Sequence, residues 1–134
     1  MLGEMISESH GKRAPRKVLA TGASGFKVEV SFEDGGKIYG HDFTQFVTYT
    51  AESRPDGSVY GDGQGVLLLQ NGEIATWKGS GVGVVKAGGA VSYRGAVYYS
   101  TASPTLSRLN TIACVFEFEV DAAGNTHSKT WEWK

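Results

Sequence analysis

The chain has 134 residues, enough for one domain around a single core and too few for two. Its 13 Lys plus Arg and 14 Asp plus Glu give a formal net charge of -1, so no strong field favours nucleic acid or an anionic membrane. No apolar run reaches the roughly 20 residues of a spanning helix, and residues 1–18 lack the apolar core of a secretory signal. We therefore expect a cytoplasmic protein that binds neither nucleic acid nor membrane.

The first half of the chain predicts a polar arm followed by strands. Residues 1–15 are polar and mixed in charge, which indicates a flexible arm before a single barrel domain at 16–134. Residues 16–21 form a weak first strand, and 26–33 alternate cleanly between apolar and charged side chains. Asp34-Gly35-Gly36 predicts a turn, and 37–52 a long strand.

A hairpin dominates the second half. Asn71-Gly72, the strongest short hairpin signal, separates the expected strands 58–69 and 73–85. Further strands are predicted at 90–101, 111–120 and 126–134, with one long connection at 102–110. The three prolines all fall outside these strands, as ladder hydrogen bonding requires.

Eight strands joined mostly by short turns favour an all-β fold, an eight-stranded antiparallel up-and-down β-barrel. A two-sheet sandwich is the alternative, but it needs longer crossing connections than this chain provides. We expect the barrel because closure removes the exposed edges that promote aggregation.

The hairpin carries glycine at every second position: Gly61, Gly63 and Gly65 on one strand, Gly79, Gly81 and Gly83 on the other. This is not the G-x-G-x-x-G spacing of a dinucleotide site, and no helix follows it, so no cofactor is predicted. A two-residue loop puts the two glycine rows on opposite faces, whereas a three-residue loop with Gly72 as a bulge puts them on one face. The sequence leaves both registers open.

Few residues are candidates for catalysis or metal binding. Cys114 lies among apolar neighbours and is expected to be a buried hydrophobe. His10, His41 and His127 lack the spacing of metal ligands, so no metal site is predicted. Arg94 interrupts an uncharged strand, and a buried pair with Glu117 would make these two residues the candidate catalytic groups.

The aromatic side chains are the candidates for ligand binding. An eight-stranded barrel either fills its interior with side chains or holds one small ligand among them. Exposed tryptophans would instead favour a homo-oligomer. The residues expected to line a cavity are Trp77, Tyr93, Tyr99, Phe116 and Phe118.

Several segments together resemble a family of uncharacterised bacterial and archaeal proteins, which is similar in turn to the allene oxide cyclase barrel among the calycin-like folds. The resemblance extends from about Arg16 onward and implies an eight-stranded barrel, often oligomeric, with an apolar cavity. It carries no catalytic residue across, since no local motif matches the cyclase site. The segments are the repeated G-x-G strands, Tyr93-Arg94-Gly95, Leu109-Asn110, Val115-Phe116-Glu117, residues 120–125 and residues 129–134.

Three functional hypotheses follow from the sequence. The first is a small barrel that binds an apolar or amphipathic small molecule. The second is a cofactor-free isomerase or cyclase that acts in the barrel cavity. The third is a filled barrel with a structural or oligomerisation role, and a solidly packed interior would leave only this one.

Overall fold

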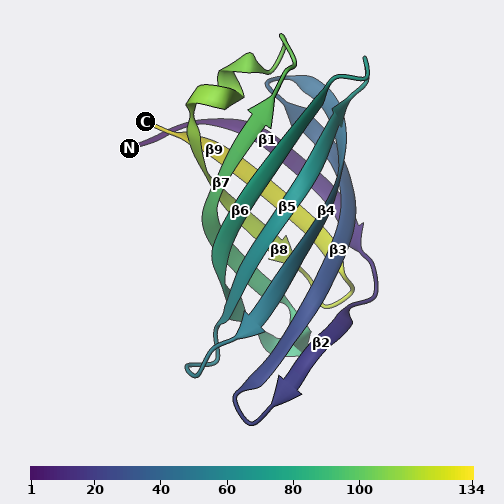
Figure 1. Ribbon diagram of the computed structural model, residues 1–134, viewed down its shortest axis with the longest axis vertical. Helices are drawn as coiled ribbons and strands as arrows, with labels where there is room; N and C mark the ends of the chain where they lie inside the picture. The colour runs from purple at the N-terminus through teal and green to yellow at the C-terminus, as the bar shows by residue number, and fades with distance from the viewer.

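Nine strands and two short 3-10 turns make up most of residues 1–134, all of which the computed structural model describes (Figure 1). No helix is long and apolar enough to cross a membrane. The elements are β1 (Leu2–Arg13), β2 (Lys17–Gly22), β3 (Gly25–Ile38), β4 (His41–Ser53), β5 (Val59–Leu69), β6 (Ile74–Val85), η1 (Ala87–Gly89), β7 (Val91–Thr101), η2 (Ser107–Thr111), β8 (Ala113–Val120) and β9 (Asn125–Trp133).

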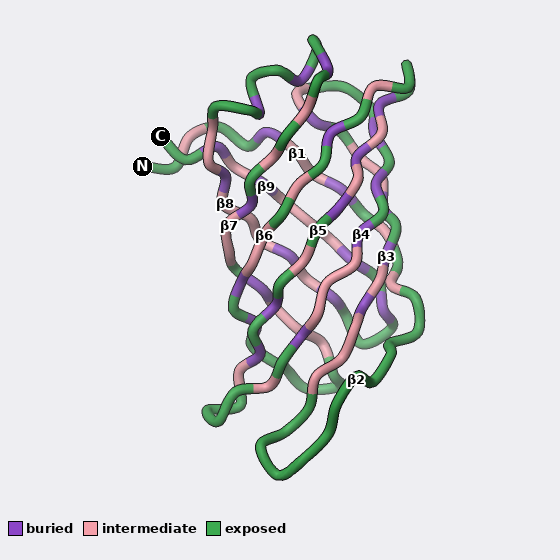
Figure 2. Tube along the Cα trace, in the orientation of Figure 1, coloured by how far each residue is buried: buried purple, intermediate pink, exposed green.

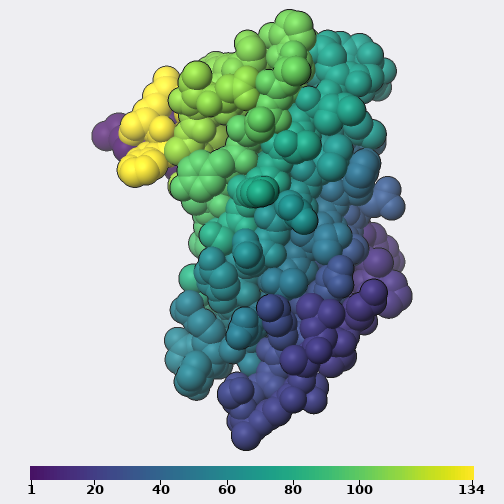
Figure 3. All heavy atoms as spheres, viewed as in Figure 1, coloured from purple at the N-terminus to yellow at the C-terminus, as the bar shows by residue number.

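The strands form a closed antiparallel barrel of eight strands with one strand added. Strands β3 to β9 pair in sequence order, β1 pairs with β9, and β1 also pairs with β3, which closes the ring. Strand β2 pairs only with β3 and extends beyond the closed ring. The all-β barrel predicted from the sequence is therefore confirmed. The first and last residues lie next to each other at one end (Figure 3).

The N-terminal segment differs from the prediction. Residues 1–15 were expected to be a flexible arm, but Leu2–Arg13 is the strand that closes the barrel. Its inward positions after Ile6 carry Ser7, Ser9 and Gly11 rather than apolar side chains, so the sequence shows no apolar alternation there. Residues 16–21, which were expected to be the first strand of the barrel, belong mostly to β2, and every residue of β2 is exposed (Figure 2).

A second difference concerns the segment 34–36, which was predicted to be a turn. These residues continue β3, and the chain reverses instead at Tyr39 and Gly40, both with positive φ. Position 36 requires glycine because the neighbouring strand β1 lies so close that a Cβ would collide with the Glu8 carbonyl oxygen. A glycine inside a strand here marks close backbone approach at the barrel seam.

The central hairpin settles the register that the sequence left open. The Leu69 N–H donates a backbone hydrogen bond to the Glu73 carbonyl oxygen across the loop 70–72, and Gly72 has a φ of 88°. The three-residue loop pairs Gly61 with Gly81 and Gly63 with Gly79. Both glycine rows consequently share one face, and that face is the inside of the barrel.

The interior is packed at both ends. One apolar cluster includes Phe32, Val59 and Val120, and the other includes Ile38 and Leu69. The second end is covered by the segment 102–111, whose Leu106 and Leu109 are fully buried. In this cap Arg108 donates to Glu132 at 2.7 Å and to Glu4 at 3.0 Å, which ties the cap to β9 and β1.

Substitution of Gly36 tests the seam. We expect Gly36→Ala to lower the free energy of unfolding by about 3 kcal/mol, because the new methyl group has no space against β1. Gly22→Ala is the control, since nothing lies within 4 Å of its added methyl group. Urea denaturation measures both, and equal stability of the two variants would contradict the close approach of β1 and β3.

Candidate functional site

A cavity lies in the middle of the barrel between the two packed ends. All eight barrel strands contribute to its lining, and the cavity volume is about 90 Å³. The interior is therefore not packed solid.

The shared glycine face explains why space remains. Gly61, Gly63, Gly79 and Gly81 all line the cavity and bring no side chains into it. Aromatic rings lie over part of this bare surface: a Cβ at Gly61 would stand 3.1 Å from the Tyr93 ring, and one at Gly81 3.1 Å from Phe116. The glycines thus form a floor, and the rings that rest on it leave the central space open.

Aromatic side chains form one end of the cavity. Phe32 and Phe118 stack with ring centroids 4.9 Å apart, while Tyr49 meets Tyr93 edge-on at 5.7 Å. Burial raises the pKa of both tyrosines, so both hydroxyls stay protonated. The five predicted lining residues, Trp77, Tyr93, Tyr99, Phe116 and Phe118, all line this cavity. Their role in ligand binding stays a prediction.

A polar wall stands next to the aromatic end. Trp77 donates its indole N–H to Gln45 at 3.0 Å, and Ser9 donates to Asp34 at 2.8 Å. Asp34 and Gln45 are direct partners across β3 and β4. Ser7, Ser9, Gln45, Ser128 and Thr130 reach the cavity itself.

Asp34 is the functional candidate that sequence reasoning missed. The residue is 7 % exposed, and its Oδ1 has no hydrogen-bond partner. Burial raises the pKa of its carboxyl, and the hydrogen bond from Ser9 offsets part of that rise. A signal was present, because Phe32, Asp34, Gly36 and Ile38 continue the inward alternation of β3 through the expected turn.

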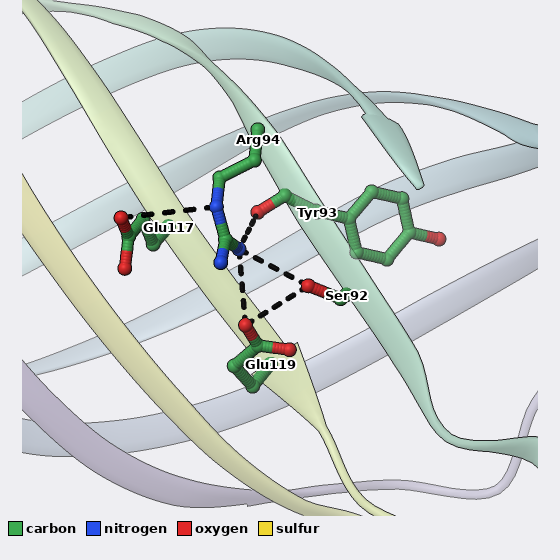
Figure 4. A network of polar contacts seen from close by, with 5 residues as sticks. All are labelled: Ser92, Tyr93, Arg94, Glu117 and Glu119. Carbon is green, nitrogen blue, oxygen red and sulfur yellow. Dashed lines mark hydrogen bonds and ion pairs between the residues drawn. The ribbon is translucent and has the colours of Figure 1, made fainter. Parts of the chain in front are cut away.

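The candidate catalytic pair lies outside the barrel. Arg94 does pair with Glu117, at 3.7 Å, and with Glu119, at 3.0 Å, but all three side chains are 42–54 % exposed. Figure 4 shows the Tyr93 ring pointing away from this network. Tyr93 faces inward, so its neighbour Arg94 must face outward. The expected buried pair is therefore a surface network, and neither residue reaches the cavity.

The other singled-out residues divide between interior and surface. Cys114 is buried, and burial raises the pKa of its thiol to about 11, as suits an inert hydrophobic side chain. His10 and His127 lie far apart in the sequence and lack the spacing of metal ligands, but their rings stack at 4.1 Å across β1 and β9. Trp131 and Trp133 point outward, and Trp133 is 62 % exposed. This exposed apolar surface is compatible with a homo-oligomer, which stays a prediction.

Replacement of Trp77 tests the contribution of the cavity wall to stability. Trp77→Ala should lower the free energy of unfolding by about 3–5 kcal/mol, since it removes the indole over Gly65 and the donor to Gln45. Trp133→Ala, on the exposed face, should change it by less than about 0.5 kcal/mol. Similar losses in urea denaturation of the two variants would contradict the placement of Trp77.

No protein-family model and no curated protein matches the sequence. Solved structures do match the fold. A protein of unknown function from Clostridium acetobutylicum ATCC 824 gives a TM-score of 0.85 at 12 % identity, covering 98 % of both chains. A β-barrel-like protein from Acinetobacter baumannii AYE gives 0.83 at 13 %, covering 100 % of this chain and 96 % of the other, and an enzyme from Penicillium herquei gives 0.73 at 15 %, covering 96 % and 92 %. The chain therefore shares its barrel fold with uncharacterised bacterial proteins and with a fungal enzyme.

Proposed function

We propose that the protein binds one small amphipathic molecule in the central cavity. The observation that carries this proposal is the hollow between two packed ends, lined by aromatic rings together with a few hydroxyl and amide groups. Ligand sites of this kind are mostly apolar with a few convergent polar groups. The sequence predicted an apolar or an amphipathic ligand, and the polar groups of the lining favour the amphipathic one.

The aromatic and the polar groups of the lining contact different parts of the ligand. Phe32, Tyr49 and Phe118 offer ring faces and edges to an apolar or planar body. Ser7, Ser128 and Thr130 offer hydroxyl groups to one polar substituent. The cavity volume of about 90 Å³ limits the ligand to a small molecule.

A substitution that fills the cavity tests the proposal. Ser128 lines the cavity and makes no side-chain hydrogen bond, so Ser128→Leu occupies the space without removing a contact. Ser100→Leu makes the same change on the exposed outer face of β7. We expect native mass spectrometry of protein purified without refolding to show a retained small molecule in wild type and in Ser100→Leu, and to show it lost from Ser128→Leu.

Two results would contradict this function. One is the absence of any retained mass in wild type together with no binding of small aromatic alcohols, measured by quenching of tryptophan fluorescence. The other is retention that is equal in Ser128→Leu and wild type while both variants keep the fold.

A second candidate function, a cofactor-free isomerase or cyclase, is favoured by the buried Asp34. A carboxyl whose pKa is raised holds its proton as a general acid does. Asp34 itself does not line the cavity, but its hydrogen-bond donor Ser9 and its cross-strand neighbour Gln45 do. The resemblance to the allene oxide cyclase barrel and the similar fungal enzyme support this candidate as analogies of fold alone. Asp34 thus replaces Arg94 and Glu117, the residues suggested by the sequence, as the candidate catalytic group.

The pH dependence of stability tests whether Asp34 holds a proton. Its pKa in the folded state lies above the ordinary value of 3.8, so its contribution to stability is full at low pH and is lost as pH rises through the folded pKa. Asp34→Asn lacks this loss. The free energy of unfolding of the variant minus that of wild type should therefore grow above about pH 4 and then level off.

Urea denaturation from pH 4 to pH 8 measures this difference, and a constant or shrinking difference would contradict the raised pKa. A second measurement separates catalysis from carriage. The retained molecule is extracted, incubated with wild type or Asp34→Asn, and resolved by chromatography. Conversion to an isomer by wild type alone would support the enzyme, and no conversion would leave carriage.

A further inference from the structure

Two histidines and a glutamate meet on the outer surface where the barrel closes. His10 on β1 lies directly opposite His127 on β9, and Glu8 is two residues before His10 on the same face. The His127 Nε2 is 2.7 Å from the Glu8 Oε2, and the two imidazole rings stack at 4.1 Å with 17° between their planes. One potential ligand atom from each residue lies within 4.8 Å of the others.

This donor set matches one class of ion. Imidazole nitrogen with one carboxylate oxygen suits zinc, nickel and copper, whereas magnesium and calcium prefer oxygen ligands throughout. Bonds of about 2.0–2.1 Å to zinc place tetrahedral ligands roughly 3.3 Å apart. The ligand atoms now lie within 4.8 Å of one another, so the three side chains must move closer together to share one ion. The residues are partly exposed, so solvent can complete the coordination.

Charged side chains surround the cluster, and the positive ones disfavour binding of a cation. Lys37 and Lys129 are the register neighbours of Glu8 on the two flanking strands, and Lys37 already pairs with Asp42 at 2.8 Å. Glu119, opposite His127 on β8, pairs with Arg94. Lys12, two residues after His10 on the same face of β1, and Lys129 enter none of the ion pairs. Lys129 is the one directly opposite Glu8.

We propose that Glu8, His10 and His127 form a binding site for one divalent transition-metal ion of the zinc, nickel and copper class, which ties β1 to β9. The site is separate from the central cavity, since its side chains face outward. Strand β1 is the one that closes the barrel, and its inward positions include Ser7, Ser9 and Gly11, which bury little apolar surface. A metal ion bound across β1 and β9 stabilises the closure because it binds only when both strands are in place.

Titration with Zn²⁺ and Co²⁺ tests the site in protein treated with a chelator. We expect saturable binding of one Zn²⁺, a Tm that rises with Zn²⁺ concentration, and visible absorption bands from bound Co²⁺ that report nitrogen and oxygen ligands. Hydrogen exchange of the β1 amides should slow when Zn²⁺ is bound.

Four variants assign the ligands. His10→Ala and His127→Ala should each weaken Zn²⁺ binding by about tenfold or more and remove the Co²⁺ bands. Glu8→Gln keeps a hydrogen-bond partner for His127 and should weaken binding several-fold. His41→Ala removes the histidine outside the cluster and should bind as wild type does.

Substitution of the opposing charge predicts a gain. Lys129→Gln should strengthen Zn²⁺ binding several-fold, a result that loss of structure cannot produce. The proposal is overturned if wild type shows no saturable binding at millimolar Zn²⁺, if binding persists in His10→Ala and His127→Ala, or if His41→Ala loses as much affinity as they do.

Discussion

The hollow interior depends on the length of one loop. Because side chains alternate along a strand, a loop of three residues rather than two at 70–72 decides that Gly61 and Gly63 face the same way as Gly79 and Gly81. With one residue fewer, one glycine row would face solvent and a row of larger side chains would enter the barrel. Because both glycine rows face inward, the barrel keeps a central cavity in which aromatic rings rest on the glycine floor. The candidate ligand site is this cavity.

Closure places polar groups beside this space. Strand β1 completes the ring with small and polar inward residues, and it approaches β3 closely enough to require Gly36. This approach brings Ser9 to Asp34 and keeps the carboxyl out of water. The polar wall is thus a consequence of how the barrel is closed, whereas the aromatic wall is a consequence of the glycine floor.

The sequence predicted the parts of the fold in which one face is apolar. The strands from 58 to 134 were identified from the Asn71-Gly72 hairpin signal, from β-branched and aromatic residues, and from alternation at 111–120. Alternation placed Phe116 and Phe118 on one face, whereas Trp77, Tyr93 and Tyr99 were chosen as aromatic residues without a known register. Strand β1 was missed because its inward residues are polar or small, and Asp34 because Asp-Gly-Gly is typical of turns. The faces of Arg94 and Glu117, and the meeting of His10 with His127, depend on strand pairing that local pattern does not specify.

A crystal structure determined under xenon pressure tests the hollow barrel most directly, because xenon binds in apolar cavities without needing a specific ligand. We predict xenon inside the barrel between Trp77 and Phe118, with both glycine rows facing it. An interior filled by side chains, or a glycine row turned toward solvent, would contradict the account.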